Sequence, residues 1–292
     1  MMKKILRSAS AVAFLLAVYT IFQLLFSVLG IMAYVVYAII NGDMTRAQLS
    51  DLNFRALGAD TVMSAYAMDA MALGLLLSSV AMLLFLHLTG FFKFRWNIFR
   101  SIKPKPLMLS TLLVFTSMFA LNIFVQWFPL ENTLETEFSE LSHTILGALS
   151  ISLFGPVLEE VLFRGAIQGY ILRKFGKPWL AIVLASLVFG IIHWNPVQVV
   201  YATLLGFIFG WLYYRTGSLL SVIVGHVLNN SIATLSELYI SNIDEPAITD
   251  SSSGVVAFLI FAVLSVLVAL KLHRSLPEPP SPWHENGTEP VE

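Results

Sequence analysis

The run SASAVAFLLAVYTIFQLLFSVLGIMAYVVYAI, residues 8–39, contains no charged side chain. A helix that crosses a bilayer needs roughly 20 mostly apolar residues, so this run is long enough to span. It is longer than the apolar part of a signal peptide, about 7–15 residues, and we interpret it as a retained first span. Further apolar runs lie at 62–90, 106–128, 143–172, 178–194, 197–214, 218–240 and 255–272. The pattern predicts an all-α, polytopic membrane protein with about eight transmembrane helices.

The composition agrees with a membrane protein and excludes several classes of function. Hydrophobic residues make up 57% of the 292 residues and charged residues 12%, whereas a soluble domain carries about 25% charged residues. The net charge of −1 indicates no nucleic-acid or acidic partner. The chain has no cysteine, which excludes disulfides, thiolate metal sites and cysteine nucleophiles.

Basic residues are concentrated in every second connection between the apolar runs, and the connection after the third run carries four glutamates but no Lys or Arg. By the positive-inside rule, this alternation predicts that both termini lie in the cytoplasm and that the chain is a multi-pass protein of the cytoplasmic membrane. The basic positions are Lys3, Lys4 and Arg7, then Lys93, Arg95, Arg100, Lys103 and Lys105, then Arg173, Lys174 and Lys177, then Arg215, and finally Lys271 and Arg274.

The chain is divided by these patterns into four segments. The last segment is rich in Pro and Glu, has little to bury, and is predicted to be a disordered cytoplasmic tail. The segments are residues 1–142 with the first three transmembrane helices and their loops, 143–240 with helices four to seven, 241–274 with the last helix, and 275–292 with the tail.

Charged residues inside the fourth run give the first indication of a site. Arg164 is the one Lys or Arg deep within a span, and Glu159 and Glu160 share its run. Because charges in hydrocarbon cost several kcal/mol each, they normally face a bundle interior, pair with one another and mark a functional site. Asp69 in the second run is interpreted as a span-end or packing acid.

The spacing within this run suggests different tasks for the two glutamates. Glu160 and Arg164 are four residues apart, which places them on one helix face in the favourable order for an ion pair that supports the structure. Glu159 is rotated by about 100° from Glu160. It is therefore left available for chemistry, unless it too pairs with Arg164.

Two further runs carry polar residues at a one-turn spacing. Phe189 and His193 are four apart near the end of the fifth run, and His226 and Asn230 are four apart in the seventh. Each pair is expected to project from one helix face toward the same neighbour. If the three runs converge on a funnel or a water-filled cavity, these residues meet Glu159.

This set of residues allows peptide hydrolysis without a Ser or Cys nucleophile. Glu159 can act as a general base, with His193 as its partner in activating water. His226 and Asn230 can stabilise the oxyanion that forms when water attacks an amide carbonyl. An alternative is a zinc site of Glu159, His193 and His226, because His₂Glu is a known catalytic ligand set; the chain has no H-E-x-x-H pair.

The motifs also resemble a known family. EEVLFR (159–164) fits E-E-x-x-x-R, FGIIH (189–193) fits F-x-x-x-H, and HVLNN (226–230) fits H-x-x-x-N, in that order. This arrangement is similar to the type II CAAX prenyl protease family, the wider group of CAAX proteases and bacteriocin-processing or Abi-type membrane proteins. The resemblance covers roughly residues 143–240. It implies an eight-helix glutamate intramembrane protease whose site is reached from the cytoplasmic side.

The resemblance also implies a role for each matching residue. Glu159 would be the base, Glu160 with Arg164 would be structural, and His193, His226 and Asn230 would have the roles given above. The expected partners are the bilayer and a peptide or protein substrate at the membrane, with no cofactor required. Two other classes of function stay open from the sequence: a non-catalytic immunity or scaffold protein, and a proton-coupled transporter that relays protons through intramembrane Glu and His.

Overall fold

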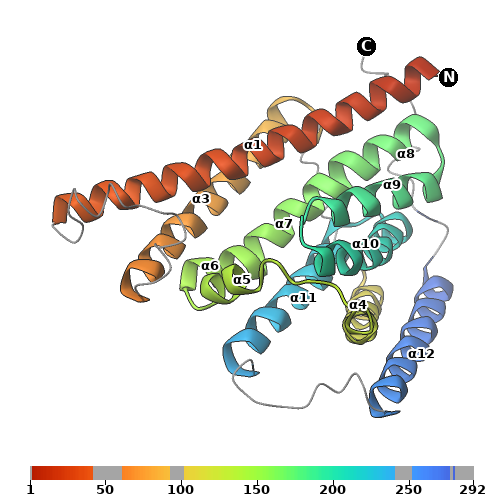
Figure 1. The fold of residues 1–292 in the computed structure, drawn as a ribbon. Helices are drawn as coiled ribbons and strands as arrows, with labels where there is room; N and C mark the ends of the chain where they lie inside the picture. The colour runs from red at the N-terminus through yellow and green to blue at the C-terminus, as the bar shows by residue number, and fades with distance from the viewer. Residues whose placement is uncertain (1, 42–60, 93–101, 241–251, 277–278, 280–292) are drawn as a thin grey trace. The chain divides into compact units, whose positions relative to one another are not determined.

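The fold was analysed in a computed structural model of the chain, which describes residues 2–41, 61–92, 102–240, 252–276 and 279 (Figure 1). In these ranges every regular element is helical, so the predicted all-α polytopic membrane fold is confirmed. The predicted tail after Leu276 lies outside the described residues, apart from Pro279. The elements are α1 (Met2–Asn41), α3 (Thr61–Leu88), α4 (Pro104–Gln126), α5 (Glu135–Ser142), α6 (Ile145–Leu149), η2 (Ser150–Phe154), α7 (Gly155–Glu160), η3 (Val161–Gln168), α8 (Gly169–Phe175), α9 (Pro178–Ile191), α10 (Pro196–Thr216), α11 (Leu219–Ile240) and α12 (Ser252–Ser275).

All eight predicted runs contain helix, but they are not equally long. Seven helices of the described chain are long and apolar enough to cross a membrane. The fifth run is different, because α9 has 14 residues and ends at Ile191. At 1.5 Å per residue this helix is about 21 Å long, shorter than the roughly 30 Å of a hydrocarbon core. The helix of the fifth run thus ends at Ile191, and the end predicted near residue 194 is wrong.

Proline and glycine set several helix ends. Pro178 and Pro196 occupy the first turns of α9 and α10, where the missing N–H is not needed. Gly176 and Gly217 end α8 and α10 with φ of 61° and 63°. These left-handed positions favour glycine, which has no Cβ to clash.

The fourth run is a continuous helical rod that contains two π-helical stretches. These are η2 and η3, and η3 begins directly after Glu160. A π-helix has i→i+5 hydrogen bonds and occurs frequently at functional sites. The sequence predicted an ordinary helix here, because nothing in the spacing of apolar residues distinguishes the two forms.

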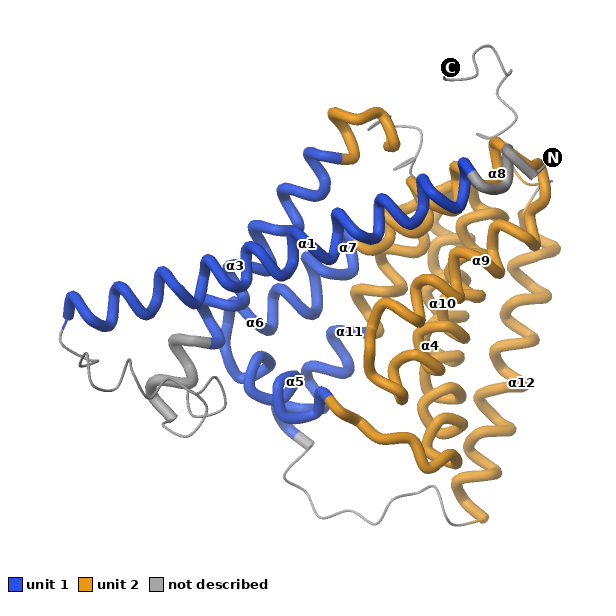
Figure 2. The backbone as a smooth tube through the Cα atoms, turned by 45° about the horizontal axis from the view of Figure 1, so that its top comes forward, with its two compact units in different colours: residues 1–85, 134–158, 230–242 blue, residues 86–133, 159–229, 243–292 orange. Residues whose placement is uncertain are grey.

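The described chain forms two compact units (Figure 2). Unit 1 comprises residues 1–85, 134–158 and 230–242, and unit 2 comprises 86–133, 159–229 and 243–292. In unit 1, α1 and α3 approach closely at two glycines. A Cβ on Gly30 would collide with the carbonyl oxygen of Ala70, and one on Gly74 would collide with the backbone of Phe26.

Unit 2 contains α4, α9, α10 and α12 together with η3, which carries Arg164. Helix α10 contacts α9, α4 and η3, while α12 packs along α4. The contact of α12 with α4 is antiparallel, since Phe261 stacks on Phe119 at 5.0 Å and Ser265 donates to the Thr116 hydroxyl at 3.0 Å. Unit 2 therefore positions η3 against α9 and α10.

Candidate active site

The buried charges of the fourth run form the predicted ion pair. Nη1 of Arg164 lies 2.8 Å from Oε1 of Glu160, and the two side chains are 1% and 0% exposed. Glu160 ends α7 and Arg164 lies in η3, so the pair bridges the transition from α- to π-helix. Burial of two opposite charges as a close pair removes most of the cost of burying either alone.

Aromatic rings complete the surroundings of the guanidinium. The Cζ atom of Arg164 lies 4.3 Å from the ring centre of Phe189 on α9 and 5.1 Å from that of Phe209 on α10. A cation above an aromatic face is attracted by the negative face of the ring, and more strongly where water is excluded. Arg164 thus connects η3 to both neighbouring helices.

His226 on α11 contacts the same carboxylate. Its Nδ1 lies 2.8 Å from Oε1 of Glu160, and its ring lies against Phe209 at 5.0 Å and Phe189 at 5.7 Å between centroids. An ionised carboxylate can only accept hydrogen bonds, so Nδ1 carries a proton and donates the hydrogen bond to Glu160. This contact orients the other nitrogen, Nε2. The contact was not predicted from the sequence.

Nε2 of His226 faces Glu159. It lies 3.6 Å from Oε2 of that residue, and the Glu159 side chain is 19% exposed while that of Glu160 is fully buried. A distance of 3.6 Å is too long for a direct hydrogen bond, but a water molecule can contact both atoms. The two adjacent glutamates therefore differ in exposure: Glu160 is fully buried, and Glu159 is partly exposed. The part of Glu159 as a base stays a prediction.

His193 lies in the turn after α9, not on the helix face that the sequence predicted. The helix ends at Ile191, Trp194 adopts a left-handed φ of 56°, and Asn195 before Pro196 is extended. Nδ1 of His193 is 2.7 Å from the carbonyl oxygen of Phe189, and the two rings meet edge to face at 5.0 Å. A carbonyl accepts only, so Nδ1 is the donor and Nε2 is the acceptor in the neutral ring.

Asn230 is one turn beyond His226 in α11 and belongs to unit 1. There its Nδ2 donates to the carbonyl oxygen of Ile151 at 3.0 Å. Its predicted part in an oxyanion site stays a prediction. The preceding Asn229 belongs to unit 2, where its Oδ1 accepts a 2.6 Å hydrogen bond from the hydroxyl of Tyr201 on α10.

The contacts that α10 makes with the charged cluster were not predicted from the sequence. Phe209 touches both Arg164 and His226, and the carbonyl oxygens of Gly206 and Gly210 accept from Arg164 at 3.5 Å and from Gln168 at 2.9 Å. The signal was present as G-F-I-F-G at 206–210, because G-x-x-x-G in an apolar helix is typical of close helix packing.

The zinc alternative can be compared with this geometry. The 3.6 Å between Nε2 of His226 and Oε2 of Glu159 is close to the separation of two ligands at about 2.0 Å from one zinc ion. Within the described ranges, however, no group of three His, Cys, Asp or Glu is placed to hold a metal ion. The described site thus offers two ligands of the three that were considered.

Comparison with known proteins finds a similarity in this part of the chain. Residues 141–232 match the family described as type II CAAX prenyl endopeptidase Rce1-like. The resemblance seen in the motifs is therefore confirmed, and all the predicted site residues, from Glu159 to Asn230, lie within the matched range.

A curated relative supports the same assignment. The "Putative membrane peptidase YdiL" of Bacillus subtilis (strain 168) is 33% identical over 87 residues, which is 30% of this chain and 35% of the relative. The match thus spans about a third of the relative's length. No solved structure matches the chain.

Proposed function

We propose that this protein is a membrane endopeptidase that hydrolyses a peptide bond with a water molecule activated by Glu159. The observation that carries the proposal is the 3.6 Å approach of Glu159 to His226 inside the segment that matches the CAAX protease family model. The exposure of Glu159 beside a fully buried Glu160 supports the choice of base. A carboxylate that water can reach is free to accept a proton, whereas Glu160 is occupied by two donors.

The proposed reaction proceeds through a tetrahedral intermediate. Water lies against Glu159, which takes one proton as the water oxygen bonds to the carbonyl carbon of the substrate. The carbonyl oxygen becomes an oxyanion, which hydrogen-bond donors stabilise. When the intermediate collapses, the C–N bond breaks and the proton held by Glu159 passes to the leaving amine. The products are a carboxylic acid and an amine, which ionise in water to a carboxylate and an ammonium group.

The hydrogen bonds of the two histidines support different tasks for them. Nε2 of neutral His193 is an acceptor, because Nδ1 donates to Phe189, and an acceptor can share the proton of the attacking water with Glu159. Nε2 of His226 can donate to an oxyanion only when both ring nitrogens carry protons, because Nδ1 already donates to Glu160. An imidazolium there would balance Glu159 and Glu160 together with Arg164. Asn230 is proposed as the second oxyanion donor.

The substrate is proposed to be a peptide or protein segment that reaches the site from the cytoplasmic side of the cell membrane. The resemblance to the CAAX protease family supports access from this side. The charge alternation of the connections supports a cytoplasmic position of both termini. No cofactor is needed by the proposed mechanism. A zinc ion held by Glu159, His193 and His226 would require another arrangement of these side chains, because the described ranges place no three possible ligands around one point.

The proposal is tested with the full chain purified in detergent and incubated with a peptide library, with cleavage followed by mass spectrometry. We expect Glu159→Gln to lose about 10²–10⁴-fold in rate, as for loss of a general base. Glu137→Gln is the matched control, because Glu137 is an exposed glutamate on α5. Equal rates for wild type and Glu159→Gln would reject the base. Loss of activity with a chelator, restored by zinc, would replace this mechanism with a metal-dependent one.

A further inference from the structure

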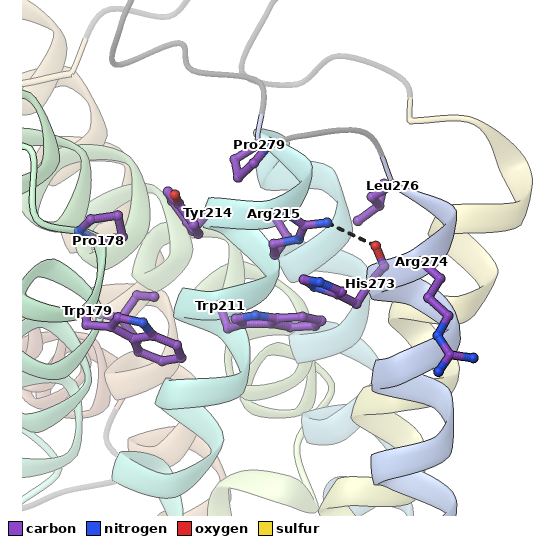
Figure 3. Close-up of a pocket in the computed structure, with 10 residues that line it drawn as sticks. Pro178, Trp179, Trp211, Tyr214, Arg215, His273, Arg274, Leu276 and Pro279 are labelled. Atoms are coloured by element: carbon purple, nitrogen blue, oxygen red, sulfur yellow. Dashed lines mark hydrogen bonds between the residues drawn. The ribbon is translucent and has the colours of Figure 1, made fainter.

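We propose that a pocket at the basic end of unit 2 binds the head group of an anionic phospholipid. The pocket has a volume of about 650 Å³ and opens among the start of α9 and the ends of α10 and α12 (Figure 3). Its lining combines aromatic and basic side chains and includes Trp179, Trp211, Tyr214, Arg215, His273 and Arg274. This site does not depend on the proposed peptidase activity.

The charges of unit 2 are distributed very unevenly along its helices. Apart from Arg164, the Lys and Arg residues described in this unit lie at one end, and Glu131 follows α4 at the other. The pocket lies at the basic end, which the positive-inside rule places in the cytoplasm. Those basic residues are Lys103 and Lys105 before and in α4, Arg173 and Lys174 in α8, Lys177 before α9, Arg215 in α10, and Lys271 and Arg274 in α12.

Arg215 is the buried charge of the pocket. It is 8% exposed, and its Nη2 donates to the carbonyl oxygen of His273 at 3.0 Å, which ties α10 to the last turn of α12 (Figure 3). The hydrogen bond to His273 holds the positive charge of Arg215 beside the pocket, and the proposal depends only on that charge. Among the pocket's lining residues no acidic side chain offsets this charge.

The aromatic residues of the pocket also suit a lipid head group. Trp and Tyr prefer the level of the lipid head groups, where one end of the ring is apolar and the other can meet water. Trp179 is 68% exposed on the first turn of α9, while Trp211 and Tyr214 come from the last turns of α10. Basic pockets between transmembrane helices on the cytoplasmic side are typical binding sites for anionic head groups. The phosphate would lie near Arg215, with the glycerol against the rings.

Competition between two lipids tests the proposal with the purified full chain. The chain in detergent is mixed with equal amounts of phosphatidylglycerol and phosphatidylcholine, and native mass spectrometry measures which lipid is retained. We expect preferential retention of phosphatidylglycerol. Arg215→Gln should weaken its apparent affinity by about fivefold, as expected for one basic residue near a lipid surface.

A second pair of variants guards against unfolding of Arg215→Gln. Arg274→Gln and Lys271→Gln remove the same charge from exposed positions of α12, but only Arg274 lines the pocket. We expect Arg274→Gln to weaken binding more than Lys271→Gln. Equal retention of the two lipids, or equal effects of these two variants, would overturn the proposal. Full displacement of phosphatidylglycerol by excess inorganic phosphate would also overturn it, because the ligand would then be a soluble anion.

Discussion

Nδ1 of His226 lies 2.8 Å from Oε1 of Glu160, although the two residues are 66 positions apart in the chain. The same oxygen lies 2.8 Å from Nη1 of Arg164. Glu160 thus connects a cation on its own rod with an imidazole on α11, and it fixes which nitrogen of His226 faces Glu159. Glu160 therefore does more than form an ion pair within its own helix, because it also orients His226 beside the proposed base, Glu159.

This relationship predicts that the two adjacent glutamates respond differently to substitution. Glu160→Gln removes one partner of a buried ion pair and should lower the free energy of unfolding by about 3–5 kcal/mol. Glu159→Gln alters a partly exposed side chain and should leave stability nearly unchanged while abolishing cleavage. Thermal unfolding in detergent, measured beside peptide cleavage, separates the two effects. Equal destabilisation by both substitutions would contradict the division of tasks.

The sequence could predict the local part of this site but not the part that depends on distant contacts. The Glu160–Arg164 pair followed from a four-residue spacing within one helix, and the buried charges lie in the segment that matches the family model. The contact of His226 with Glu160 joins separate helices, and no periodicity encodes it. The π-helix after Glu160 could not be predicted from the spacing of hydrophobic residues either, because this spacing does not show which hydrogen bonds the backbone makes. The end of the fifth helix at Ile191 could not be predicted, because Pro196 restricts only the residue before it and residues 192–194 include neither Gly nor Pro.

Phe209 is predicted to stabilise the charged cluster through its ring. Its face lies 5.1 Å from the Arg164 guanidinium and its ring 5.0 Å from that of His226, and the side chain is fully buried. Phe209→Leu keeps most of the apolar volume and should destabilise by about 1–2 kcal/mol, largely from the lost cation–π contact. Phe209→Ala also leaves a cavity and should destabilise by about 3–5 kcal/mol. Denaturant titration of both variants checks this order, and a Phe209→Leu variant as stable as the wild type would rule out a special role for the ring.

Close packing of α10 on α9 is predicted to require glycine at position 206. A Cβ there would lie 3.2 Å from Cδ1 of Phe189 and 3.2 Å from Cα of Ser186, tighter than ordinary van der Waals contact. Gly206→Ala should therefore move Phe189 and destabilise the fold by about 1–3 kcal/mol, the usual range for overpacking. Thermal unfolding measures the loss. Combining Gly206→Ala with Phe189→Leu, which shortens the obstructing side chain, should recover part of it, and a purely additive double variant would refute the proposed clash.

Trp194 is predicted to hold His193 in place through its backbone and not through its side chain. Its φ of 56° lies in the left-handed region, while the indole is 78% exposed. Glycine adopts this conformation without strain, so Trp194→Gly should preserve the turn and the cleavage activity. A β-branched residue is a strong outlier there, so Trp194→Val should shift the turn and displace His193. We expect the valine variant to lose activity at least tenfold, equivalent to about 1.4 kcal/mol in the barrier, while the glycine variant retains it. If the glycine variant loses as much as the valine variant, the indole itself contacts the substrate, and the role assigned to the backbone is wrong.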